Sequence, residues 1–155
     1  MLKASDFKVG DAVYGFVDES TGENVHVASG QLREWCLKHQ SELEVYTIPV
    51  LQEWAHQFIN DNSVLMVRVM ELVKNKSTEP IIHAKWGTFT NGAPDVILVD
   101  GHHRYVAAAI RGDLLIESYL IERPIWEQFR IEGFAKLTQE QMKAIPVAKR
   151  NYSPI

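Results

Sequence analysis

Cysteine is almost absent from the sequence, since Cys36 is the only one among 155 residues and no internal disulfide can form. Long apolar runs are also missing, and none approaches the roughly 20 residues that a membrane-spanning helix needs. The opening stretch MLKASDFKVGDAVYG lacks the apolar core of a signal peptide. Together these absences predict a cytoplasmic protein with no membrane partner.

A basic stripe of the kind that grips duplex DNA is not found either. The chain has 16 Lys and Arg residues against 20 Asp and Glu residues, for a formal net charge of −4. The densest basic group, Lys143, Lys149 and Arg150, is typical of a solvated terminus. The charge balance therefore makes DNA a less favoured partner.

What is present is a good supply of core-forming residues, because 46% of the chain is hydrophobic. The length suits one domain, or one domain with an appendage. From residue 43 onward the patterns predict strand, helix, helix, strand, strand, helix and strand, which is an α/β or α+β fold with a mixed sheet and flanking helices. The expected units are an N-terminal β-hairpin and helix (1–40), a core (41–123) and a C-terminal helical extension (124–155).

Several local features predict where the elements begin and which residues they bury. Ser29 is expected to cap the first helix, and Pro49 to lie in the first turn of the second. Apolar residues at helical spacing predict two buried helix faces: Leu51, Trp54, Ala55 and Phe58 on one helix, and Val64, Val67, Met70 and Val73 on a helix over 63–74. The run DVILV predicts a strand buried on both faces, and Thr138 is expected to cap a short helix near the end.

The stretch VDGHHRYVAAAIRG (99–112) concentrates polar groups where a strand passes into a helix. Ligands gather at the carboxyl ends of strands in open α/β sheets, and a helix start offers unpaired N–H groups to an anion. Gly101 would let a ligand approach the backbone, and Arg104 can donate two hydrogen bonds to a phosphate. His102 and His103 are further donors. The sequence therefore predicts a phosphate-binding turn.

Each of these residues also has a purely structural interpretation. Asp100 could cap the helix, Gly101 could only shape a turn, and Arg104 could pair with a structural carboxylate. One of the two histidines is expected to be structural, because consecutive helical residues point about 100° apart. The three consecutive alanines at 107–109 predict a narrow helix that lies close to the sheet.

The motif DGHHRYVAA resembles the G-x-x-R-x-x-A-A signature of the ParB/sulfiredoxin superfamily, and the similarity extends over about residues 44–122. The resemblance implies a turn that binds the phosphates of a nucleoside triphosphate, ATP or CTP, with Mg²⁺. The candidate nucleotide-binding residues are Gly101, His102, His103, Arg104 and Tyr105. Sulfinic acid reduction is disfavoured, because His102 stands where sulfiredoxins carry a reactive cysteine. The short stretch after Glu122 also disfavours a helix-turn-helix region of the partition-protein kind.

Two hypotheses follow. The first is an enzyme that hydrolyses a nucleoside triphosphate or transfers a phosphoryl group, with Asp100, His103, Arg104 and Glu79 as candidate catalytic residues. The second is a non-catalytic nucleotide- or DNA-binding module that acts on a protein partner, with a ParB-like nuclease between the two. No metal site of the protein's own is predicted, since no H-x-x-x-H or C-x-x-C spacing occurs. Trp86 and the loop GTFTNGAPD are candidates for base stacking and for a lid.

Overall fold

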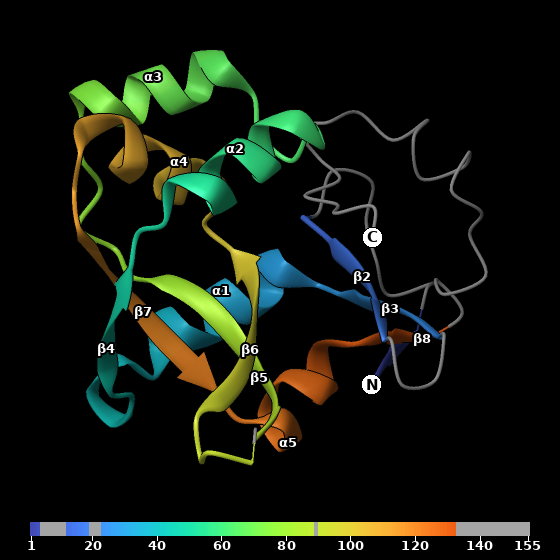
Figure 1. Ribbon diagram of the computed structural model, residues 1–155. Coiled ribbons are helices and arrows are strands. Elements are labelled where there is room, and N and C mark those ends of the chain that lie inside the picture. The colour runs from blue at the N-terminus through green and yellow to red at the C-terminus, as the bar shows by residue number, and fades with distance from the viewer. Residues whose placement is uncertain (4–11, 19–22, 89, 133–155) are drawn as a thin grey trace.

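A four-stranded mixed sheet forms the centre of the protein in the computed structural model, which describes residues 1–3, 12–18, 23–88 and 90–132 (Figure 1). The strand order is β4–β7–β5–β6. The strands are β4 (Val45–Pro49), β5 (Ile81–Thr88), β6 (Pro94–Asp100) and β7 (Leu115–Ile121). β5 pairs parallel with β7 and antiparallel with β6, while β4 pairs antiparallel with β7. The predicted α+β fold with a mixed sheet is therefore confirmed.

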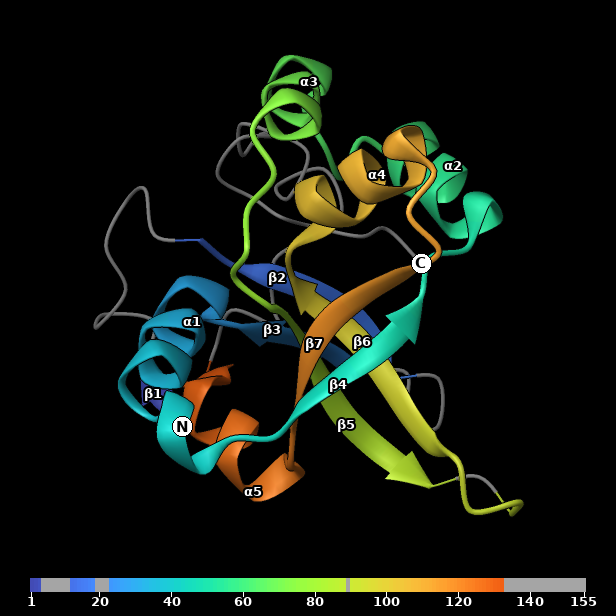
Figure 2. The same ribbon diagram turned by 90° about the vertical axis from the view of Figure 1, so that its left-hand side faces the viewer.

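Three helices cover one face of this sheet (Figures 1 and 2). They are α2 (Gln52–Asn60), α3 (Met66–Lys74) and α4 (His102–Arg111). Phe58 from α2 and Val69 from α3 pack with Val106 from α4 and with Ile81 and Leu98 from the sheet. Burial of this apolar surface is the main free-energy source for the layer. The alanines at 107–109 are buried as predicted, so α4 lies close to its neighbours.

The N-terminal part of the chain covers the other face. It consists of the hairpin of β2 (Tyr14–Asp18) and β3 (Glu23–Val27), followed by α1 (Ser29–Lys38). Phe16, Leu32 and Cys36 share one core with Val99 of the sheet and with the fully buried Trp126 of α5 (Arg123–Trp126). The hairpin and helix predicted for residues 1–40 are thus present, and the boundaries of the three expected units stay a prediction.

Short elements complete the described chain. They are β1 (Leu2–Lys3), which pairs parallel with β8 (Ile131–Glu132), and the 3₁₀ turns η2 (Gln40–Glu42) and η3 (Glu127–Phe129). No helix among the described residues has the length and apolar content needed to cross a membrane. The predicted helix at Thr138 and the basic residues of the C-terminal segment lie outside the described residues.

Two predicted helix starts are wrong. Pro49 ends β4 rather than opening a helix, because β4 continues to pair with β7 up to Leu115, and α2 begins at Gln52. Ser29 is already helical and fully buried, and Ala28 is the N-cap. Strand pairing at Pro49 and burial at Ser29 therefore decided where these helices begin, rather than the residue types that favour a helix start.

The predicted buried faces are only partly right. In α3, Val69 is fully buried, whereas Val67 is 72% exposed and Met70 is 44% exposed. Both exposed residues lie on parts of α3 that the other described elements do not fully cover. In α2, Ala55 and Phe58 are buried, but Leu51 and Trp54 are not.

The run DVILV is not buried along its whole length, because β6 is an edge strand of the sheet. Only Leu98 and Val99 are fully covered, and their side chains join opposite cores. The strand is therefore buried on both faces only at the end that leads into α4.

Candidate functional site

The turn between β6 and α4 is held by Gly101, which has φ 110° and is the N-cap of α4. A Cβ on Gly101 would lie 2.4 Å from Cγ2 and 2.6 Å from Cβ of Ile81 in the neighbouring strand. Both the left-handed backbone and the close packing require glycine here. The glycine thus lets β6 turn sharply against β5.

The start of α4 presents backbone N–H groups that the helix itself does not pair. The first intrahelical hydrogen bond runs from the Tyr105 N–H to the Gly101 carbonyl, over 2.9 Å. The N–H groups of His102, His103 and Arg104 precede it, so they have no carbonyl partner within the helix. The partial positive charge at this end of α4 favours an anion.

Arg104 ties the start of α4 to the segment that enters β5. Its Nη1 donates to the carbonyls of Glu79 at 2.7 Å and Pro80 at 2.9 Å, and its Nη2 donates to the Asp100 carboxylate at 2.7 Å. The Arg104 side chain is only 13% exposed. Arg104 therefore pairs with a carboxylate of the structure, as one of its two interpretations predicted. It also lines a cavity.

Asp100 is not the helix cap, because its carboxylate bonds to Arg104 and no side chain caps α4. Burial raises the pKa of this carboxyl group, while the guanidinium groups of Arg104 and Arg33 oppose the rise. The Asp100–Arg104 ion pair therefore lines the cavity wall at the corner between β6 and α4.

The two histidines have different roles. His103 Nε2 accepts a hydrogen bond from the Leu65 N–H at 3.0 Å, at the start of α3. Burial and then the charges of Arg68 and Arg104 lower the pKa of His103 to about 4. The ring is therefore neutral near pH 7, with its proton on Nδ1, and offers a single donor. The structure thus makes His103 a neutral donor at this pH.

The His102 ring is buried, with its centroid 4.9 Å from that of Tyr14 and 4.8 Å from that of Phe58. It can serve a ligand only through its backbone N–H. His102 is the structural histidine of the pair that the sequence predicted.

Tyr105 does not reach the site. Its side chain is buried, its hydroxyl accepts from the Leu51 N–H at 2.8 Å, and it donates to the Pro49 carbonyl at 3.1 Å. The hydroxyl therefore joins the end of β4 and the start of α2 to α4. The motif tyrosine has a structural role here, and the structure does not bring it to the other candidates.

A cavity of about 380 Å³ opens in front of the turn. Six of its lining residues are those that the sequence singled out: Glu79, Asp100, Gly101, His102, His103 and Arg104. The structure therefore brings together all four predicted catalytic residues and four of the five predicted nucleotide-binding residues.

Two further arginines line the same cavity, Arg33 from α1 and Arg68 from α3. Neither arginine carries a signal in the sequence, because each is a single basic residue within a predicted helix. Both are far from the motif in the sequence, so that only the folded structure shows that they lie near it. With Arg104 they place three guanidinium groups beside two carboxylates, those of Asp100 and Glu79.

Glu79 lies at the junction of α1 and α4. Its Oε2 is 2.8 Å from Arg33 Nη2 and 3.8 Å from Arg104 Nη1. Figure 2 shows the segment that joins α3 to β5 running between α1 on one side and α4 on the other. Glu79 is therefore part of the site's ion-pair network and not a solvated helix-end residue.

Trp86 and the loop after it lie elsewhere. Trp86 stacks on Trp126 with 5.3 Å between ring centroids, and the Arg123 guanidinium lies 4.4 Å from its ring centre. The loop that joins β5 to β6 lies at the far end of these strands from α4 (Figure 1). Among the described residues, Trp126 and Arg123 thus pack against the Trp86 ring, and the loop between β5 and β6 does not lie over this cavity.

Comparisons of the chain with protein-family models, with curated proteins and with solved structures find no match. The class that the structure defines is an α+β protein with a strand-turn-helix corner facing an arginine-lined cavity. The similarity to the ParB/sulfiredoxin superfamily stays a prediction that rests on the motif and the order of elements. Within the described chain, no group of three or more His, Cys, Asp or Glu side chains is placed to hold a metal ion.

Proposed function

We propose that the cavity in front of Gly101 binds the phosphate groups of a nucleoside triphosphate, which the protein hydrolyses or uses for phosphoryl transfer. The observation that carries the proposal is the meeting of Arg33, Arg68 and Arg104 with the N-terminal end of α4 in one cavity. Guanidinium groups bind phosphates through paired hydrogen bonds, and backbone N–H groups at a helix start add fixed donors. The cavity volume, about 380 Å³, is within the range of small-molecule sites.

Each residue would have a defined task. Arg68 on α3 is exposed and would contact phosphate oxygens directly, while His103 would donate from Nδ1. Arg104 would mainly hold Asp100 and the start of α4 in position. Catalysis in such a site is chiefly positioning and charge neutralisation.

Mg²⁺ fits the donor set only in part. Asp100 and Glu79 supply carboxylate oxygens, which suit a hard cation, but both are held by arginines. The ion would be held mostly by the phosphates, with one of these carboxylates added. Bound Mg²⁺ would neutralise phosphate charge.

A non-catalytic nucleotide-binding module is the second candidate. It is favoured by the pairing of both candidate carboxylates with arginines, which leaves neither placed as a free general base. Binding without turnover would then be the activity of the protein.

The test is calorimetric titration with ATP, CTP and GTP in Mg²⁺, together with measurement of phosphate release. Arg68→Ala should weaken binding about tenfold or more, which corresponds to the loss of one charge-assisted contact. Lys74→Ala is the matched control, since Lys74 is also an exposed cation on α3 but does not line the cavity. Release of phosphate by the wild type supports the enzyme, and binding without release supports the module. Failure of the wild-type chain to bind any nucleotide overturns the proposal.

A further inference from the structure

Arg33 reaches the cavity from α1, which lies outside the predicted nucleotide-binding core. Its Nη2 donates to Glu79 Oε2 at 2.8 Å, so an N-terminal helix is joined to the segment before β5. Leu32 and Cys36 on the same helix are fully buried, which fixes the position of α1 against the sheet. The N-terminal unit is therefore part of the wall of the site.

The Glu79 carboxylate shows where an oxyanion is favoured. It lies between two guanidinium groups, with Oε2 at 2.8 Å from Arg33 and 3.8 Å from Arg104. A phosphate group likewise presents negatively charged oxygen acceptors that an arginine can bind through paired hydrogen bonds. A terminal phosphate could thus take over the hydrogen bond that Glu79 now accepts from Arg33.

Resting on the function proposed above, we propose that Arg33 is the specificity-determining residue that selects a triphosphate over a diphosphate. Glu79 holds the Arg33 guanidinium in the cavity wall until the outermost phosphate replaces the carboxylate. On this proposal a diphosphate, held by the start of α4 and Arg68, lacks the outermost phosphate that would contact Arg33. Glu79 therefore competes with the outermost phosphate for the Arg33 guanidinium.

The exchange is feasible because the Arg33 ion pair is loosely held. The Arg33 side chain is 45% exposed, and an exposed ion pair contributes little to stability. Arg104, in contrast, is held by two carbonyls and Asp100, so it stays in place. Arg33 is therefore the arginine of the site that is free to change partner without loss of the fold.

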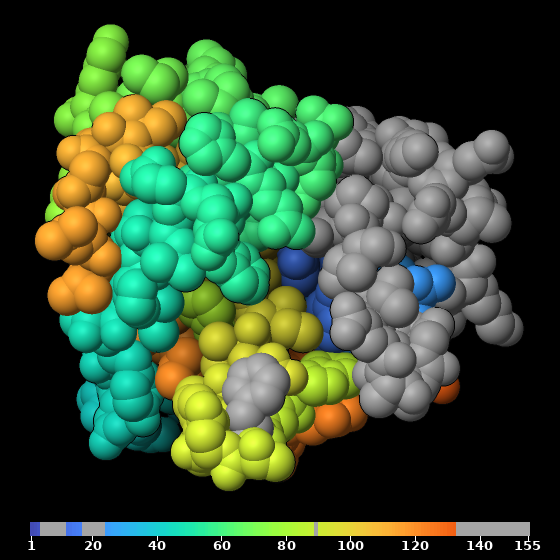
Figure 3. Space-filling view, in the orientation of Figure 1, coloured from blue at the N-terminus to red at the C-terminus, as the bar shows by residue number. Residues whose placement is uncertain are grey.

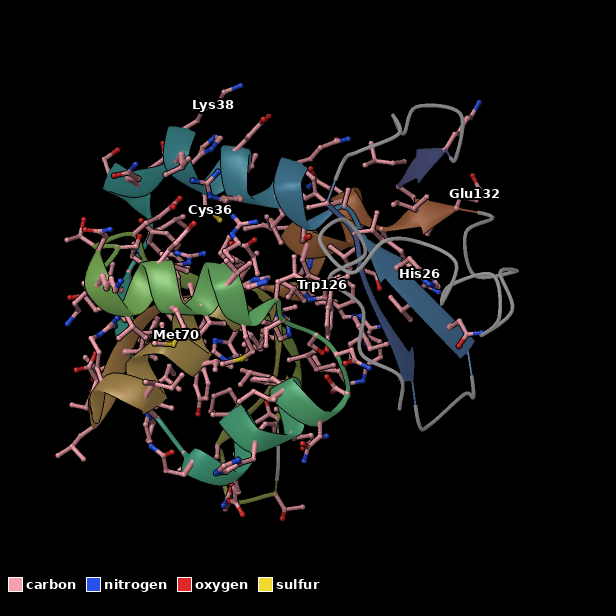
Figure 4. All side chains as sticks on the ribbon, turned by 90° about the horizontal axis from the view of Figure 1, so that it is seen from above. His26, Cys36, Lys38, Met70, Trp126 and Glu132 are labelled. Atoms are coloured by element: carbon pink, nitrogen blue, oxygen red, sulfur yellow. The ribbon has the colours of Figure 1, made fainter. Side chains whose placement is uncertain are left out.

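The experiment is a titration of the full chain with ATP and ADP, and with inorganic tripolyphosphate and pyrophosphate, all in Mg²⁺. Arg33→Ala should weaken triphosphate binding about tenfold and diphosphate binding less than about threefold. Lys38→Ala is the matched control, because Lys38 is on the same helix and points away from the rest of the molecule (Figure 4). Its dissociation constants should equal those of the wild type.

Glu79→Gln gives an independent readout. Removal of the competing charge should tighten triphosphate binding about threefold or more, and this gain should vanish when Arg33 is also replaced by Ala. Weaker triphosphate binding by Glu79→Gln would instead mean that the carboxylate serves the ligand, and would overturn the competitor role.

Equal losses for tri- and diphosphates in Arg33→Ala, or no loss, overturn the selectivity while leaving the proposed function standing. Failure of the wild-type chain to bind any of the four ligands removes both. Circular dichroism and thermal melting verify that the variant is folded. Should Arg33→Ala not fold, Arg33→Lys keeps the charge without the paired donors, and must show a smaller loss of the same kind.

Discussion

Gly101 and Ile81 are in direct contact across the β5–β6 pair, where a Cβ at position 101 would lie 2.4 Å from Cγ2 of Ile81. The contact explains why the corner between β6 and α4 can lie so close to the sheet. It also means that no side chain larger than that of glycine fits at position 101, whether or not a ligand is bound.

Gly101→Ala should destabilise the fold by about 3 kcal/mol or more, because it combines a left-handed backbone with a clash against a buried side chain. Gly112→Ala is the control, since Gly112 has φ 81° but its Cβ would meet nothing within 4 Å. That variant should lose only about 1 kcal/mol. Urea denaturation measures both, and equal losses would contradict the assigned contact.

Arg104→Ala should destabilise the protein by about 2–4 kcal/mol at pH 7, because it leaves the Asp100 carboxylate buried without its partner. Loss of the guanidinium raises the pKa of Asp100 further, so the folded variant takes up a proton that the unfolded chain lacks as the pH falls. The difference from wild type should therefore shrink as the pH falls from 7 toward 3.8, the ordinary pKa of an Asp side chain. Adding Asp100→Asn should recover part of the loss at pH 7, and a pH-independent difference would contradict the pairing.

Val69→Ala in α3 should cost about 2 kcal/mol, since the side chain is fully buried against α4. Val67→Ala removes the same atoms from a residue that is 72% exposed, and it should change the free energy of unfolding by less than about 0.5 kcal/mol. Thermal denaturation of the two variants compares them directly. A larger loss for Val67→Ala than for Val69→Ala would mean that Val67, as the sequence pattern predicted, is on the buried face of α3.

Acidification should destabilise the fold through His83. Its Nδ1 lies 2.7 Å from the Ser118 hydroxyl, and burial lowers its pKa from the usual 6.5 to about 4. Between pH 6.5 and pH 4 the unfolded chain binds a proton that the folded chain does not. The stability present above pH 6.5 is thus lost at about 1 kcal/mol per pH unit. His83→Gln should flatten this slope in denaturation curves, although His26 and His103, whose pKa values are also about 4, keep part of it.

In Figure 3 the residues of α2 lie at the surface of the molecule, above those of β6 in this view. The helix itself was predicted correctly from its apolar spacing, yet Trp54 on it is 49% exposed. Spacing indicates which residues share one side of a helix. How much of that side is covered depends on the neighbouring elements, which the pattern does not contain.

The sequence by itself determined the order of strands and helices, the alanine-rich α4 and the corner from Asp100 to Arg104. These features depend on local physics: alternation of apolar residues, glycine at positive φ, and polar groups at a helix start. The tertiary structure alone decided that Tyr105 faces away from the corner and that His102 is enclosed by aromatic rings.

Tertiary structure also decided that Arg33 and Arg68 complete the cavity. Both come from helices distant along the chain, and only the packing of α1 and α3 around the segment before β5 brings their charges together. Local patterns carry no information on such long-range contacts, because these depend on how whole elements bury their apolar faces against one another.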